Sequence, residues 1–166
     1  MKKLIIMCAV ILILSGCGKK TDIKPIVKNI SFNTDITYYN EKYAAKGSID
    51  SDGILTLQIF EPSELSGMTF TVDGQDVKID YKGLTFSPNS NSISSAAVAM
   101  LYSGFSAVEQ NNADYEYDEK NYTVTAKTDN GEFIMNYSPT GLPLEIRCLS
   151  SAFEAKIYDI KLLKNE

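Results

Sequence analysis

The sequence predicts an α+β protein, mainly β, in which an antiparallel sheet of about nine or ten strands carries one amphipathic helix. Three observations lead to this fold class. Apolar and polar residues alternate along most of the chain, which is typical of half-buried strands. Asp-Gly and Asn-Gly pairs separate several alternating segments, and such pairs favour tight hairpin turns. One segment in the middle has apolar residues at helical spacing instead.

The N-terminus has the layout of a signal peptide. Lys2 and Lys3 precede an uninterrupted apolar run from Leu4 to Leu14, and the small residues Ser15 and Gly16 follow it. This run is much shorter than the roughly 20 apolar residues that a helix needs to span a hydrocarbon core. The pattern therefore favours a cleaved export signal over a permanent transmembrane helix.

The four residues Leu14-Ser15-Gly16-Cys17 resemble the lipobox of bacterial lipoproteins. The resemblance implies that Cys17 becomes the first mature residue, carries lipid such as palmitate, and anchors the chain to the outer face of the cell membrane. We expect residues 1–16 to be removed and residues 17–25 to form the lipidated N-terminus and a tether. Residues 26–166 then form a single, mostly β domain. The tether from Gly18 to Pro25 reaches at most roughly 30 Å when fully extended.

Strands are predicted on both sides of the middle segment. In the first half, four segments each have one apolar face. Its residues are Ile30, Phe32, Ile36 and Tyr38 in the first segment; Leu55, Leu57 and Ile59 in the second; Met68, Phe70 and Val72 in the third; and Val77, Ile79 and Tyr81 in the fourth. In the second half, they are Tyr122, Val124 and Ala126; Phe133, Met135 and Tyr137; and Leu144, Ile146 and Cys148. Turns at Asp73–Asp76 and Asp129–Gly131 predict two hairpins. The segment Phe153–Leu163 changes phase near Ile157 and Tyr158, which predicts a bulge.

One amphipathic helix is predicted from about Ser92 to Gln110. Its apolar positions are Ile93, Ala96, Ala97, Met100, Leu101, Gly104, Phe105 and Val108. Several of them are small, so we expect the helix to lie close against the sheet. A cluster of serines and asparagines precedes the helix and offers N-terminal caps, and Asn111-Asn112 offers an end.

A residue type on which many catalytic and metal sites depend is missing. The chain contains no histidine, whereas zinc sites and Ser or Cys nucleophiles usually depend on imidazole. Cys8 leaves with the signal and Cys17 takes lipid, so Cys148 remains alone and we expect it in the core. We predict no enzyme activity, no catalytic residue, no metal and no cofactor.

An acidic run from Asp114 to Glu119 alternates carboxylates with tyrosines and invites comparison with a calcium site. In an EF-hand loop the sixth position is glycine, whereas Glu119 stands there when Asp114 is counted as the first. We favour a solvated strand edge, since exposed charge also discourages edge-to-edge pairing.

The charge balance excludes one class of partner. Removal of residues 1–16 takes away Lys2 and Lys3 and no acidic residue, which leaves 14 basic against 21 acidic side chains and a formal charge of −7. Binding to nucleic acid needs a basic footprint, so we expect no nucleic-acid partner.

A weaker resemblance concerns the fold. Pro62, Leu65, Gly67, Phe70, the Asp73-Gly74 turn and the run Tyr81-Lys82-Gly83-Leu84 resemble a pattern found in small, mostly uncharacterised lipoproteins of Gram-positive bacteria. With its order of strands, helix and strands, the mature chain resembles the LolA-like half-barrel, a curved antiparallel sheet whose concave face is covered by helix. The resemblance implies that lipid or acyl chains bind between sheet and helix, or that a protein binds the same surface.

Two function classes therefore remain open. The first is a tethered, non-enzymatic module that binds an apolar or lipid-like ligand, with a lining of Met68, Phe70, Phe105, Phe133, Met135 and Tyr137. Each of these residues also fits an ordinary packed core, which we favour for any one of them. The second is a structural or regulatory lipoprotein that binds another cell-envelope protein through a sheet edge or its acidic face.

Overall fold

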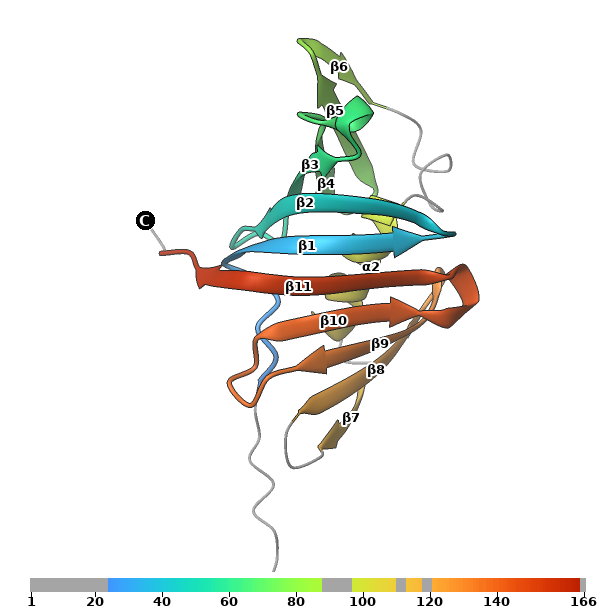
Figure 1. Cartoon of the computed structure of the whole chain (residues 1–166). Helices are drawn as coiled ribbons and strands as arrows, with labels where there is room; N and C mark the ends of the chain where they lie inside the picture. The colour runs from blue at the N-terminus through green and yellow to red at the C-terminus, as the bar shows by residue number, and fades with distance from the viewer. Residues whose placement is uncertain (1–23, 88–96, 110–112, 118–120, 165–166) are drawn as a thin grey trace, which may run out of the picture.

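The computed structural model describes residues 24–87, 97–109, 113–117 and 121–164. Within these residues the chain forms eleven strands in a single sheet, one α-helix and two short 3-10 turns (Figure 1). The elements are β1 (Ile30–Tyr38), β2 (Glu41–Ile49), β3 (Leu55–Glu61), η1 (Ser63–Leu65), β4 (Thr69–Asp73), β5 (Asp76–Tyr81), β6 (Leu84–Phe86), α2 (Ala97–Glu109), β7 (Ala113–Tyr117), β8 (Tyr122–Thr128), β9 (Gly131–Tyr137), β10 (Pro143–Cys148), η3 (Leu149–Ser151) and β11 (Phe153–Leu162).

The strands form two meanders that meet in the middle of the sheet. Their order is β6-β5-β4-β3-β2-β1-β11-β10-β9-β8-β7, and neighbouring strands are antiparallel. The first and last strands therefore pair with each other at the centre. Because β6 and β7 lie at opposite edges, the connection that contains α2 must cross the whole sheet.

Helix α2 packs on one face of the sheet, which we call the inner face. It contacts β8 on one side and β4 on the other, although six strands lie between them in the sheet order. Seven steps of about 4.8 Å would place those strands roughly 34 Å apart in a flat sheet. A helix of 13 residues is only about 20 Å long at 1.5 Å per residue. The sheet must therefore curve around the helix, and the predicted curved antiparallel sheet with one helix is confirmed.

The hydrophobic core lies between α2 and the inner face. Alternate residues of the central strands are buried there, such as Ile30, Phe32 and Ile36 of β1. Phe32 lies opposite Gly47 of β2. A Cβ atom at position 47 would stand 2.5 Å from the Phe32 ring, so glycine makes room for the aromatic side chain.

The two predicted hairpins are confirmed. β4 and β5 pair from Thr69 opposite Asp80 to Asp73 opposite Asp76. Gly74 in the turn between them has a φ of +59°, which glycine adopts without steric cost. β8 and β9 pair down to Thr128 and Gly131. The predicted bulge lies in β11 opposite Ser31 and Asn33, where the register shifts and Asp159 has a φ of +52°.

Two details differ from the sequence-based expectations. The sheet has one strand more than the predicted nine or ten among the described residues, counting the three-residue edge strand β6. Leu144, which we expected to face inward with Ile146 and Cys148, is 38% exposed. The reason is a register shift between Pro143 and Glu145, which breaks the alternation at the start of β10.

Both ends of the predicted helix and the whole predicted signal segment lie outside the described residues. The described helix covers Ala97–Glu109 of the expected Ser92–Gln110, so Ser92 to Ala96 and Gln110 are not described. Cys17 and the signal segment are also outside the described residues. No described helix is long and apolar enough to cross a membrane.

Candidate functional site

The interface between α2 and the sheet is tightly packed. Phe133, Met135 and Tyr137 of β9 are fully buried, and Phe105 of α2 is 3% exposed. The Phe105 ring lies 5.6 Å from the Phe32 ring, measured between centroids. A Cβ atom on Gly104 would stand 2.7 Å from Ile146 Cγ2, so the helix backbone lies close to β10. Four of the six predicted lining residues thus lie together in a filled core.

A small cavity beside the last turns of α2 also leaves little room. It measures about 10 Å³ and is lined by Val27, Lys28, Ile49, Gly53, Tyr102, Phe105, Ser106 and Glu109, which is close to the space of one water molecule. Lys28 Nζ lies 2.6 Å from Glu109 Oε1. This hydrogen bond raises the pKa of Lys28 above its usual value and ties the end of α2 to the segment before β1.

The other two predicted lining residues lie on a more open part of the inner face. Phe70 of β4 stands opposite Leu57 of β3 and Ile79 of β5, and Ile79 stands opposite Phe86 of β6. Residues opposite each other in antiparallel strands share a face, and Leu57 is fully buried in the core. Met68 lies two residues before Phe70 and is also half-buried.

An apolar row therefore continues from the core to the edge of the sheet. Leu84 and Phe86 at its outer end are 61% and 52% exposed. We call this surface the apolar strip and define it as Met68, Phe70, Ile79, Tyr81, Leu84 and Phe86. In Figure 1, β5 and β6 form the top of the sheet and α2 lies behind the central strands.

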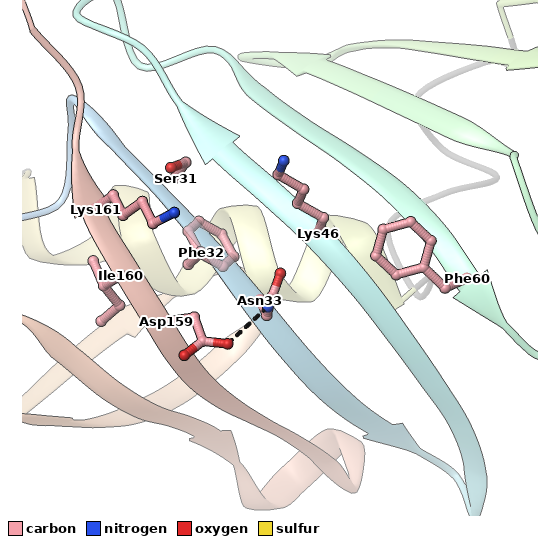
Figure 2. A pocket seen from close by; sticks show the side chains of 8 residues that line it. All are labelled: Ser31, Phe32, Asn33, Lys46, Phe60, Asp159, Ile160 and Lys161. Atoms are coloured by element: carbon pink, nitrogen blue, oxygen red, sulfur yellow. Dashed lines mark hydrogen bonds between the residues drawn. The ribbon is translucent and has the colours of Figure 1, made fainter.

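A polar pocket of about 570 Å³ lies over the central strands (Figure 2). It is lined by Ser31, Phe32, Asn33, Lys46, Phe60, Asp159, Ile160 and Lys161. Asn33 and Lys46 stand opposite each other in β1 and β2, on the face away from α2, because they alternate with the buried Phe32 and Ala45. The Asn33 amide donates a hydrogen bond of 3.0 Å to Asp159 at the bulge. The volume is in the range of small-molecule sites.

The charges around this polar pocket favour a negatively charged group. Lys46 and Lys161 line it, and among the described residues neither forms an ion pair. Asp159 is the one carboxylate in the lining. None of its lining residues belongs to the predicted set, because the pocket depends on how β1, β2, β3 and β11 pair.

A second pocket of about 340 Å³ lies farther along β1, with Asp35, Ile36, Thr37, Lys42, Tyr43, Ala44, Glu61, Glu154 and Lys156 in its lining. The Tyr158 hydroxyl donates a hydrogen bond of 3.1 Å to Asp35. This bond raises the pKa of Tyr158 above its usual value. Acidic and basic side chains are mixed here, so the lining shows no preference for one charge.

Two other features of the sequence are Cys148 and the acidic run from Asp114 to Glu119. Cys148 is a free, buried thiol, and its Sγ lies 3.3 Å from Ser150 Oγ, so its predicted place in the core is confirmed. Asp114 and Glu116 are exposed on β7, while Asp118 and Glu119 lie outside the described residues. No group of three or more Cys, Asp or Glu side chains among the described residues is arranged to hold a metal ion.

Comparisons with known proteins relate this chain to others by fold. No family model and no curated protein matches the sequence. A solved structure of an uncharacterised conserved protein from Thermus thermophilus has a TM-score of 0.56 at 8% identity, covering 85% of this chain and 82% of that one. This similarity shows a shared fold.

Two other solved structures are similar at lower scores. A LolA superfamily protein from Nitrosomonas europaea has a TM-score of 0.49 at 9% identity, covering 87% of this chain and 90% of that one. Lipoprotein LppX from Mycobacterium tuberculosis has a TM-score of 0.39 at 10% identity, covering 81% and 88% respectively. Structures similar to this chain thus include proteins described as LolA-like and as lipoproteins.

Proposed function

We propose that the protein is a lipid-anchored, extracytoplasmic module that binds an apolar or lipid-like ligand without chemical conversion. The observation that supports this function is the apolar strip. Large side chains continue along the inner face beyond α2, and Leu84 and Phe86 stand mostly exposed at its end. Exposed apolar surface of this kind typically marks a site of binding.

The proposal places the ligand differently from the sequence-based expectation. The interface under α2 is filled by Phe105, Phe133 and Met135, so an acyl chain there would have to displace core side chains. On the apolar strip, the ligand covers Phe70, Leu84 and Phe86 without that cost. Met68 and Phe70 are the two residues of the predicted lining that we retain in the proposed site.

The anchor of this module is the lipid on Cys17. The sequence before it supports export and lipidation, and the tether holds the domain within roughly 30 Å of the bilayer. A ligand drawn from the membrane then has a short path to the domain. No cofactor, metal or nucleic acid enters the proposal.

Oleate binding tests the proposed site. A chain that begins at Ile23 contains all the described strands and α2, and native mass spectrometry with added oleate measures binding to it. We expect one oleate per chain and at least a tenfold loss of affinity in a variant with Leu84→Glu and Phe86→Glu. Each of these side chains contributes about 1.5 kcal/mol or more when buried, and about 1.4 kcal/mol corresponds to tenfold.

Leu149→Glu is the matched control for that experiment. Leu149 is 76% exposed and lies in η3, away from the apolar strip, so this variant should bind oleate like the natural chain. Equal binding by the strip variant would contradict the proposed site.

The second candidate is a module that binds another cell-envelope protein, and the edge strand β6 favours it. Among the residues that the structure describes, β6 pairs with β5 on one side only, so its other side offers backbone groups to an added strand. If the natural chain binds no oleate while the exposed edge captures an extended peptide, this second function replaces the first.

A further inference from the structure

The place where the tether leaves the domain is fixed by the structure. The Ile26 amide donates a hydrogen bond of 2.8 Å to the Gly141 carbonyl, in the connection between β9 and β10. The start of β1 pairs with the end of β11, where Ile30 stands opposite Leu162. Ile26, the start of β1, the start of β10 and the end of β11 therefore lie at one end of the sheet, which we call the tether end.

The tether end carries exposed leucines. Leu162 is 63% exposed, Leu163 is 39% exposed and Leu144 is 38% exposed. The Leu163 amide donates a hydrogen bond of 2.7 Å to the Asn29 carbonyl, so this segment is held against the start of β1. Apolar side chains at the point where a lipid tether leaves can enter the membrane interface at little conformational cost.

Basic residues flank these leucines along the chain, with Leu162 opposite Ile30 on the inner face and Lys161 opposite Ser31 on the other face, so they reach the tether end from opposite faces. Lys161 and Lys164 are exposed on either side of Leu162 and Leu163. Lys161 also reaches the polar pocket, where Lys46 approaches from β2 (Figure 2). The acidic residues Asp50 and Asp52 follow β2 at this same end, because the Asn29 amide also donates a hydrogen bond of 3.3 Å to the Asp50 carbonyl. The polar pocket thus has two lysines against one carboxylate, Asp159, although the mature chain as a whole is acidic.

We propose that the tether end docks on the anionic membrane surface to which the chain is anchored. Leu162 and Leu163 enter the interface, and Lys161 and Lys46 contact the phosphates of lipid headgroups. The inference rests on the lipid anchor at Cys17 in the proposed function. The acidic domain as a whole is repelled by anionic lipid, but the tether keeps the docking surface close to the bilayer and so raises its effective concentration there.

Tryptophan fluorescence tests this orientation, because the chain contains no tryptophan. Leu162→Trp reports on the tether end, and Leu149→Trp reports on the opposite end, since Leu149 precedes the start of β11. Both positions are exposed leucines. The full lipidated chain is reconstituted in vesicles of phosphatidylglycerol and phosphatidylcholine, and flotation of the vesicles measures anchoring separately.

We expect Leu162→Trp emission to shift to shorter wavelength in these vesicles and to be quenched by brominated lipid, while Leu149→Trp emission stays unchanged. Chains that float with the vesicles but show equal emission at the two positions would overturn the docking and leave the anchor intact. Chains that do not float would overturn the anchor, and the docking with it.

The lysines are tested in the Leu162→Trp background. A variant with Lys46→Gln and Lys161→Gln should lose most of the difference in emission between vesicles with phosphatidylglycerol and vesicles of phosphatidylcholine alone. Lys42→Gln is the control, because Lys42 lies at the other end of β2. An unchanged difference in the double variant would overturn the contact with headgroup phosphates.

Discussion

Thr34 is a polar residue in an apolar setting. It is fully buried in β1 between Ala45 of β2 and Ile157 of β11. Its hydroxyl has no hydrogen-bond partner among the described residues. A buried hydroxyl without a partner costs free energy relative to the same group in water.

Thr34→Val should therefore stabilise the protein. Valine keeps the shape of threonine and removes the unpaired hydroxyl, so we expect the free energy of unfolding to rise by about 1 kcal/mol. Denaturant titration measures the change. Thr56→Val, on the opposite face of β3 where the side chain is partly exposed, should stay within about 0.5 kcal/mol. A loss of stability in Thr34→Val would show that the hydroxyl has a partner in solution.

At the scale of the element, the position of α2 depends on a small residue. Gly104 lies at the middle of the helix and allows the backbone to approach Ile146 of β10. Glycine in a helix normally costs about 1 kcal/mol relative to alanine. Close contact between helix and sheet therefore outweighs helix propensity at this position.

The sign of a substitution tests this view of α2. Gly104→Ala should lower the free energy of unfolding by about 1–3 kcal/mol, because the added methyl group overpacks the interface. Thermal and denaturant unfolding measure it. Ser106→Ala, a partly exposed position of the same helix, should change stability little. An increase in stability for Gly104→Ala would mean that the helix packs less closely than the structure shows.

At the scale of the whole molecule, the proposed function makes the location of the protein depend on lipid at one residue, Cys17. Two acyl chains on Cys17 would suffice for stable anchoring, since each buried methylene contributes about 0.8 kcal/mol. Without them, an acidic chain has no strong attraction to anionic lipid. The rest of the domain should fold in the same way with or without the lipid, because all its described strands follow the tether.

Cys17→Ala should abolish incorporation of labelled palmitate and release the protein from membranes. Labelling in cells and fractionation measure both effects. Cys148→Ala is the control, because Cys148 is buried in β10 and should leave labelling and location unchanged. Palmitate on the Cys17→Ala variant would contradict the proposed anchor.

Local patterns determined much of the fold. Alternation along β1, β3, β8 and β9 predicted which residues are buried, because side chains of a strand point to opposite faces in turn. Local sequence also predicted the turns at Gly74 and Gly131 and the mid-chain helix, since each depends on residues close in sequence. The predicted inward position of Leu144 was wrong, because the register shift at the start of β10 depends on how β10 pairs with its neighbour β9.

The candidate sites were decided by tertiary structure. The sequence by itself determined the lack of histidine and the apolar faces of the strands, and it predicted a signal segment and lipid on Cys17. Only the folded chain decided that Phe133, Met135 and Tyr137 fill a core while Leu84 and Phe86 remain exposed. Burial on the inner face depends on which strands α2 covers. It likewise decided that Lys46 and Lys161, far apart in sequence, line one pocket, because pairing of β11 and β2 with the two sides of β1 brings them together.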